Sequence, residues 1–296
     1  MGPQPAAHVN CQNRQILAHS LHDSRVVILR KLTEDFGKTQ NLGVLQWPAM
    51  AEITEIAPEV YRICFYLPQI DLQFSQFLIK DDEPVLFHTL MRGMFPQTRE
   101  AVAKIIPPEK LRWISFSHFE ADECGALNEW LVAAPNAEAV CSPLAALVNI
   151  NDFATRPARQ LTPKDTLSTG RYKLRYINTP QLPHGWDAGV MFEETTKTLF
   201  CSDVLHQQGV CDALTTSDVL GRVRKTLADY NANELLAGYQ PYTAQTGRTL
   251  ERLAELGPAR LATMHGSVFE GNGAAVLRDL AVVMREVLGD GATAQA

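Results

Sequence analysis

The sequence lacks the features that mark membrane proteins, disulfide-rich secreted domains and nucleic-acid-binding proteins. Its apolar runs, such as the one over 144–148, fall far short of a membrane span, and no leader of signal-peptide length opens the chain. The six cysteines are scattered without a C-x-x-C pair, so neither a thiolate zinc site nor a disulfide framework is indicated. Acidic residues outnumber basic ones, 33 to 27, which disfavours nucleic-acid and membrane partners because both attract clustered positive charge. We therefore expect a soluble, cytoplasmic protein.

The composition that is present is that of an ordinary globular chain. With 296 residues, 46% of them hydrophobic and 20% charged, it can bury a substantial core in one large domain or two small ones. Residues 1–47 carry no sustained hydrophobic period, and we interpret them as an N-terminal extension. No long linker divides the remainder, so 48–296 is predicted to form a single domain.

Apolar periodicity places strands and helices in a repeated order. Alternation of period two predicts antiparallel strands between residues 51 and 88, and a mixture of helix and strand patterns follows between 98 and 141. The order then repeats, with strands over 173–177, 189–193 and 198–201, helices over 217–236 and 243–256, a strand over 261–264 and a closing helix over 274–288. This order predicts an α/β fold in which two halves of similar plan pack face to face.

The segment 117–125, with the sequence SHFEADECG, concentrates groups that bind metals. It follows a short predicted strand, and ligands in α/β folds tend to bind at the carboxyl ends of strands. His118, Glu120 and Asp122 alternate at period two, so an extended turn would point all three side chains to one side. Taken alone, such a segment is more often a solvated turn than a metal site, and the interpretation depends on further ligands elsewhere.

Three further residues of ligand type, His184, Asp203 and His265, follow predicted strands. Between Asp122 and His184 lie 61 residues, between His184 and Asp203 lie 18, and between Asp203 and His265 lie 61. In this order and spacing the chain resembles the metallo-β-lactamase superfamily, and within it the di-iron domain of flavodiiron proteins and stand-alone oxygen-binding di-iron proteins. The resemblance covers residues 50–288 and implies a four-layer αββα metallo-β-lactamase sandwich with a binuclear metal centre.

The resemblance also implies a set of ligands. His118, Glu120 and His184 would bind the first metal, Asp122 and His265 the second, and Asp203 would bridge the two. The hydrolases of the superfamily usually have histidine where Glu120 stands, and an anionic oxygen donor suits iron or manganese better than zinc. We expect two iron ions, with zinc or manganese as the alternatives.

One position departs from the family pattern, which often continues H-x-E-x-D-H, because this chain has Glu123 in place of the last histidine. Glu123 could replace that histidine as an oxygen ligand, or the second metal could be weakly held. We favour a third alternative, in which Glu123 turns outward and leaves an open position for water or a gas. Four more residues could support the site from behind, although each also has a plain structural interpretation: His88, Asp187, His206 and Ser267.

Iron at such a centre binds dioxygen or nitric oxide, so the resemblance implies an oxygen or nitric oxide reductase, or an oxygen sensor. The flavodiiron reductases carry a flavin domain after the metal domain, whereas this sequence ends soon after the closing helix. We expect no flavin in this chain, and a separate electron donor if it is an enzyme. The alternatives are a metal-dependent hydrolase of an ester, lactone, thioester or phosphodiester, and a non-catalytic binding module that keeps the fold. The oligomeric state is open, with a homodimer among the options.

Overall fold

The structure is a computed structural model that describes residues 46–289 of the chain. The N-terminal extension expected over residues 1–47 lies outside this range except for its last two residues. Within 46–289, no helix combines the length and the apolar content that crossing a membrane requires. The cytoplasmic location expected from the composition stays a prediction.

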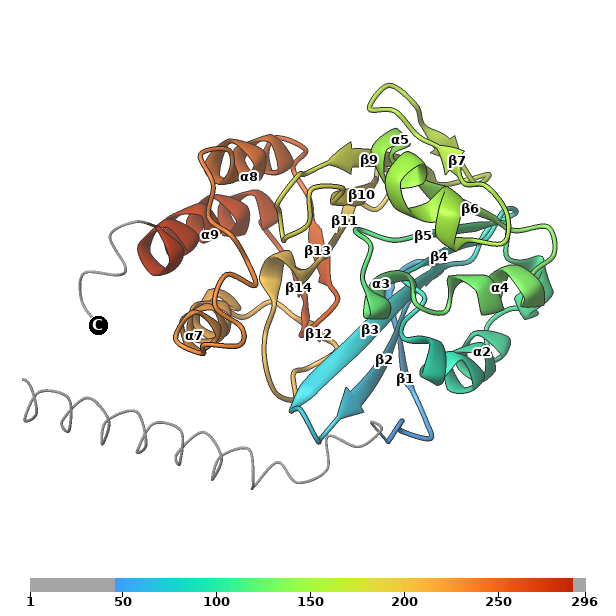
Figure 1. Ribbon diagram of the computed structural model, residues 1–296, viewed down its shortest axis with the longest axis horizontal. Helices are drawn as coiled ribbons and strands as arrows, with labels where there is room; N and C mark the ends of the chain where they lie inside the picture. The colour runs from blue at the N-terminus through green and yellow to red at the C-terminus, as the bar shows by residue number, and fades with distance from the viewer. Residues whose placement is uncertain (1–45, 290–296) are drawn as a thin grey trace, which may run out of the picture. The chain divides into compact units, whose positions relative to one another are not determined.

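Two sheets form the centre of the fold (Figure 1). In spatial order, the first sheet contains β1 (Glu52–Ala57), β2 (Val60–Leu67), β3 (Leu72–Ile79), β4 (Val85–Phe87), β5 (Trp113–Ser115), β6 (Glu138–Cys141) and β7 (Arg159–Gln160). The second contains β12 (Leu214–Thr215), β14 (Val268–Glu270), β13 (Arg260–Thr263), β11 (Thr198–Ser202), β10 (Gly189–Glu193), β9 (Lys173–Asn178) and β8 (Leu167–Ser168). Strands β1 to β4 pair antiparallel and β4 to β7 pair parallel, so the sheet is mixed. The second sheet is also mixed.

Helices cover the outer faces of both sheets (Figure 1). Helices α2 (Phe95–Ala103) and α4 (Leu127–Ala133) lie against the first sheet, whereas α7 (Leu220–Asn231), α8 (Thr246–Ala254) and α9 (Gly273–Leu288) pack on the second. Short helical turns occupy the connections, namely η1 (Arg92–Met94), η2 (Pro108–Lys110), α3 (Ala121–Cys124), α5 (Pro143–Ala145), η3 (Ala146–Ile150), α6 (Asn151–Phe153) and η4 (Asp203–Leu205). This succession of layers confirms the predicted αββα sandwich.

Two hydrophobic clusters hold the layers together. One lies between the sheets, where the ring centroid of Phe200 is 5.3 Å from that of Phe77 and 5.5 Å from that of Phe87. The other lies between the second sheet and its helices, where Leu199 packs with Leu250 of α8. Because successive side chains of a strand point to opposite faces, β11 contributes Phe200 to the cluster between the sheets, and Leu199 and Cys201 to the other. The second sheet is therefore buried on both faces.

Helix α7 is shorter than the sequence predicted. The helix expected over 217–236 begins at Leu220 and ends at Asn231. Beyond it, the side-chain oxygen of Asn233 accepts a hydrogen bond from the backbone N–H of Leu235, a local contact that competes with helical hydrogen bonding. Leu235 is 72% exposed, so no buried apolar face favours continued helix. The following residues form a loop that leads back to the site described below.

One carboxylate joins a turn of the first sheet to a turn of the second. Asp81, between β3 and β4, accepts a hydrogen bond from Thr169 Oγ1 at 2.8 Å. It also accepts backbone hydrogen bonds from Arg171 at 2.7 Å and Tyr172 at 3.1 Å, in the turn between β8 and β9. Burial raises the pKa of Asp81, but the hydrogen bonds outweigh burial and hold the pKa below its usual value. The ionised carboxylate therefore stabilises the junction between the sheets.

We expect Asp81→Ala to lower the free energy of unfolding by about 1–3 kcal/mol, because the substitution leaves hydrogen-bond donors without their partner. Asp82→Ala is the matched control, since Asp82 is the exposed neighbour in the same turn. Urea unfolding of both variants, followed by circular dichroism, measures the difference. Equal unfolding midpoints for the two variants would contradict this role of Asp81.

Candidate metal centre

The segment 117–125, predicted to bind metal, begins just after β5 ends. Glu120 has an extended backbone, with φ −142° and ψ 160°, and its carbonyl oxygen accepts the N–H of Cys124 at 3.0 Å. That hydrogen bond starts α3, so Asp122 lies in a helical turn. The prediction that His118, Glu120 and Asp122 alternate along one extended turn is therefore wrong for Asp122. The chain turns into the helix between the two carboxylates, and the three side chains still approach one region.

The loop that carries the motif is held at Ser117. The Ser117 carbonyl oxygen accepts hydrogen bonds from the backbone N–H of Gly189 at 2.9 Å and from the Tyr176 hydroxyl at 3.0 Å. A Cβ atom at Gly189 would lie 2.3 Å from the Tyr176 ring, so this close approach requires glycine. Both partners belong to the second sheet, and the loop of the first sheet is thereby fixed against it.

Glu123 lies beneath the site and is completely buried. Its carboxylate accepts the backbone N–H of Ser117 at 2.9 Å and a short hydrogen bond from the hydroxyl of Ser202, at the end of β11. Its Oε2 also lies 3.1 Å from His88 Nε2, without the alignment of a hydrogen bond. Burial raises the pKa of Glu123 to about 8. The outward orientation expected for Glu123 is therefore wrong, because donors from both sheets hold its side chain inside.

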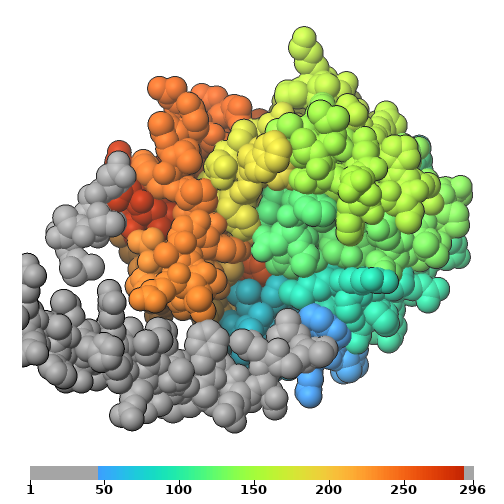
Figure 2. All heavy atoms as spheres, in the orientation of Figure 1, coloured from blue at the N-terminus to red at the C-terminus, as the bar shows by residue number. Residues whose placement is uncertain are grey.

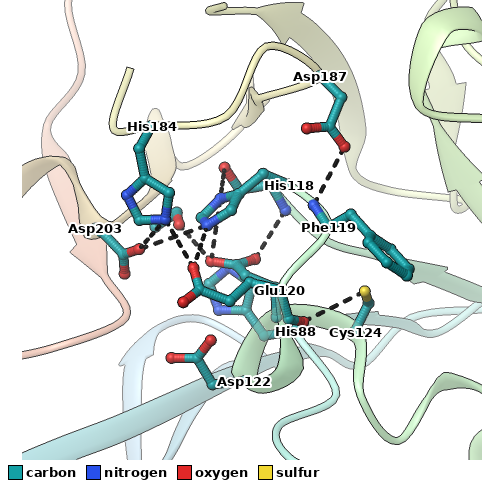
Figure 3. A network of polar contacts seen from close by, with 12 residues as sticks. His88, His118, Phe119, Glu120, Asp122, Cys124, His184, Asp187 and Asp203 are labelled. Atoms are coloured by element: carbon teal, nitrogen blue, oxygen red, sulfur yellow. Dashed lines mark hydrogen bonds and ion pairs between the residues drawn. The ribbon is translucent and has the colours of Figure 1, made fainter. Parts of the chain in front are cut away.

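Two histidines meet around one oxygen of Glu120, as Figure 3 shows. Glu120 Oε2 lies 2.9 Å from His118 Nε2 and 2.7 Å from His184 Nε2. Asp203 Oδ2 stands 3.8 Å from His118 Nε2 and 3.9 Å from His184 Nε2. We call these four residues the first cluster. Their ligand atoms all lie within 4.8 Å of one another, so one metal ion could contact all of them.

A second group surrounds His265. His265 Nε2 lies 3.3 Å from Asp122 Oδ2 and 3.3 Å from Asp203 Oδ1. Its other ring nitrogen, Nδ1, is 2.7 Å from the carbonyl oxygen of Gln73, which in the neutral ring makes Nδ1 the donor and leaves Nε2 free to bind a metal. His206 also offers a ligand atom within 4.8 Å of those of Asp203 and His265. We call Asp122, Asp203, His206 and His265 the second cluster. Asp203 belongs to both clusters and turns one oxygen toward each.

The carboxylates of the two clusters shift the pKa values of the histidines. Burial opposes the charged form of His118, but the nearby carboxylates, Glu123 foremost, raise its pKa to about 10. Burial opposes the charged form of His265 as well, and Asp122 with Asp203 raises its pKa to about 9. The protonated histidines thus compensate the negative charge of the carboxylates. A bound cation could supply the same charge in place of those protons.

Asp187 supports the motif loop through its backbone. Its Oδ2 accepts the N–H of Phe119 at 3.2 Å, a contact drawn in Figure 3, and the side-chain N–H of Asn149 at 2.9 Å. Within residues 46–289 no hydrogen bond joins Asp187 to a histidine ring. Its position therefore agrees with the structural interpretation of this residue.

His88 and Ser267 lie close to the clusters without entering them. His88 is completely buried, its Nδ1 lies 3.1 Å from the carbonyl oxygen of Ser75, and burial lowers its pKa to about 3, which keeps the ring neutral. Ser267 is buried and follows His265 by two residues. His206, expected only as a supporting residue, is the one that the structure brings within ligand range.

Two tyrosines at the site were not predicted from the sequence. The Tyr239 hydroxyl donates to Asp203 Oδ2 at 3.2 Å, and its ring centroid is 4.6 Å from that of His184. The Tyr230 hydroxyl lies 3.3 Å from His206 Nε2. One tyrosine comes from α7 and the other from the loop that follows it. A single tyrosine at such a position has no periodic pattern or motif, so no signal in the sequence could have identified either.

A cavity of about 220 Å³ opens over the second cluster. In Figure 2 the surface is hollowed where the blue-green, green and orange segments meet. The cavity is lined by Leu72, Phe74, Met91, Glu120, Ala121, Asp122, His206, Tyr230, Leu236, Tyr239 and His265. Its volume is below the usual range of pockets for drug-sized ligands and suits a small molecule.

Comparison with known families identifies the domain. A family model described as ODP family beta lactamase matches residues 72–266. The chain belongs to this family. The matched range begins at β3 and includes every residue of the two clusters. The ODP match therefore covers the whole candidate metal centre.

Relatives and solved structures agree with the ODP assignment. The rubredoxin-oxygen oxidoreductase of Megalodesulfovibrio gigas is 23% identical over 212 residues, 70% of this chain and 52% of the relative. The anaerobic nitric oxide reductase flavorubredoxin of Salmonella arizonae is 25% identical over 213 residues, 67% of this chain and 42% of the relative. The chain thus spans about half the length of these relatives.

The fold comparison gives the same result. The structure is similar to that of rubredoxin oxygen:oxidoreductase from Desulfovibrio gigas, with a TM-score of 0.69, 20% identity, and coverage of 79% of this chain and 62% of that one. It is also similar to the flavodiiron protein from Giardia intestinalis, with a TM-score of 0.65, 19% identity, and coverage of 80% and 60%. The ODP domain described here therefore has the fold of a flavodiiron metal domain.

We expect Glu123→Ala to lower the free energy of unfolding by about 3 kcal/mol, because it leaves a cavity and buried donors without an acceptor. Glu123→Gln keeps the volume and one acceptor oxygen, so its loss should be smaller than that of the alanine variant. Chemical denaturation of the metal-free proteins measures both differences. A Glu123→Ala chain as stable as the wild type would contradict the anchoring role assigned to this carboxylate.

Proposed function

We propose that the two clusters bind two iron ions, and that the resulting centre binds or reduces dioxygen or nitric oxide. In the proposed assignment, His118, Glu120 and His184 bind the first ion, Asp122 and His265 bind the second, and Asp203 bridges the two. All six side chains belong to the clusters described above, which supports the assignment. Membership of the ODP family supports it independently.

The observation that carries the proposal is the position of Asp203. Its carboxylate is 2% exposed, with Oδ2 facing the histidines of the first cluster and Oδ1 facing His265. Oδ1 is buried and has no hydrogen-bond partner among the described residues. A buried carboxylate oxygen without a donor is costly, and a cation on that side would compensate its charge. The site therefore fits a pair of metal ions that share this carboxylate.

The donor set favours iron over zinc. Glu120, Asp122 and Asp203 contribute anionic oxygens beside the imidazole nitrogens, and this mixture suits iron or manganese. Cys124 offers no thiolate, because burial raises the pKa of its thiol and its Sγ donates to the carbonyl oxygen of Glu120. When bound, a pair of ferrous ions supplies open coordination positions for a diatomic ligand and electrons for its reduction.

The size of the cavity and the relatives indicate the ligand class. A volume of about 220 Å³ is ample for dioxygen or nitric oxide. One relative is named for oxygen reduction and another for nitric oxide reduction. We propose the same small ligands here, with electrons from a flavin or a rubredoxin, which the names of these relatives include. Without such a donor the centre would serve as an oxygen sensor.

The full chain, loaded anaerobically with ferrous iron, should bind two ions per chain and develop visible absorption when exposed to air or nitric oxide. Asp203→Ala removes the shared carboxylate, so we expect it to lose at least one ion and most of the absorption change. Asp279→Ala is the matched control, since Asp279 lies exposed on α9. Elemental analysis and anaerobic absorption spectroscopy provide the two measurements.

Two outcomes would contradict this function. A protein that retains two zinc ions, rejects iron and shows no spectral response to either gas would favour the alternative of a metal-dependent hydrolase. Equal metal content in Asp203→Ala and Asp279→Ala would show that Asp203 bridges nothing.

A further inference from the structure

His206 lies inside the second cluster, three residues after Asp203. Its backbone N–H donates to the carbonyl oxygen of Asp203 at 3.1 Å, which closes the short turn η4 and directs the imidazole back toward the carboxylate. The side chain is 2% exposed, and its ring centroid is 4.5 Å from that of His265. A ring nitrogen of His206 lies within 4.8 Å of the ligand atoms of both neighbours.

The hydrogen bonds of His206 leave one nitrogen free. Nε2 lies 3.3 Å from the hydroxyl of Tyr230, whereas Nδ1 is buried and has no partner among the described residues. A buried nitrogen without a partner is unusual, because most buried polar atoms are hydrogen-bonded. In a metal-bound histidine, one ring nitrogen binds the ion and the other is hydrogen-bonded to a neighbouring group that orients the ring. The two nitrogens of His206 have this arrangement.

Glu123, the buried carboxylate beneath the clusters, is not free to bind the second ion. Glu123, next to Asp122 in sequence, uses its carboxylate on the N–H of Ser117 and the hydroxyl of Ser202. In the assignment proposed above, the first ion has two imidazoles, whereas the second has one. With His206 included, each ion would have two imidazoles and one carboxylate of its own beside the shared Asp203.

We propose that His206 is a ligand of the second metal ion, together with Asp122, Asp203 and His265. This inference rests on the proposed binuclear centre and extends it by one residue. Tyr230 then acts as a positioning residue, because its hydroxyl holds the ring nitrogen that does not bind the metal. The ligand set is completed by the residue that directly follows the η4 turn rather than by one from the motif segment.

The test uses the full chain and Co²⁺ alone, which can replace Fe²⁺ and remains stable in air. Each imidazole bound to paramagnetic Co²⁺ contributes one exchangeable N–H resonance far outside the normal proton spectrum. If His206 binds, the fully loaded wild-type chain shows four such resonances, from His118, His184, His206 and His265. His206→Phe should show three, and the Kd of its second Co²⁺ should rise by about 10-fold or more.

Tyr230→Phe is the control that separates a ligand from a packing residue. It removes only the hydroxyl next to His206, so the four resonances should remain while one of them exchanges faster with water. The wild-type count decides the question even if His206→Phe fails to fold. Two bound ions with three resonances in the wild-type chain would overturn the role of His206 alone. Fewer than two bound ions would overturn the binuclear centre as well.

Discussion

Carboxylates that repel one another have to be held together at this site, and much of the surrounding structure meets that requirement. Glu123 and Asp203 are almost completely buried, and Glu120 and Asp122 lie beside them. Water cannot screen the two buried groups, so protein groups have to compensate each of them. Each oxygen of Glu123 accepts a hydrogen bond, one from the backbone N–H of Ser117 and one from the hydroxyl of Ser202. Glu120, Asp122 and Asp203 instead turn oxygens toward imidazole nitrogens of the two clusters. These two forms of compensation separate the group that supports the site from the groups that could bind metal.

The same carboxylates connect the two halves of the sandwich. Glu123 follows a strand of the first sheet, and its partner Ser202 ends a strand of the second. At the far turns of the sheets, Asp81 makes a similar connection to the turn before β9. The hydrophobic cluster between the sheets stabilises their contact but does not determine their relative orientation, since apolar contacts have little geometric preference. The polar contacts of Glu123 and Asp81 depend on geometry, so they fix how the strand ends that carry the proposed ligands face each other.

The sequence predicts the αββα fold and the six proposed ligands because both depend on order along the chain. Asp203 and His265 follow β11 and β13, which are parallel neighbours, so the two residues leave the sheet at the same edge. Features decided by local hydrogen bonding were not predictable in the same way. Asp122 lies in a helical turn, α7 ends before a side-chain contact of Asn233, and Glu123 is drawn inside by donors from distant segments.

The absence of a side chain at Gly189 limits which substitutions this protein can tolerate there. Gly189 touches no ligand atom in the structure, yet the Tyr176 ring passes so close to it that even a methyl group would collide. Displacing Tyr176 would release the carbonyl oxygen of Ser117, and with it the loop that carries His118. In a screen of random variants for metal binding, substitutions of Gly189 would therefore be as damaging as substitutions of the proposed metal ligands. The constraint at that position is steric fit, although what the fit maintains is the placement of a metal-site loop that follows a strand of the opposite sheet.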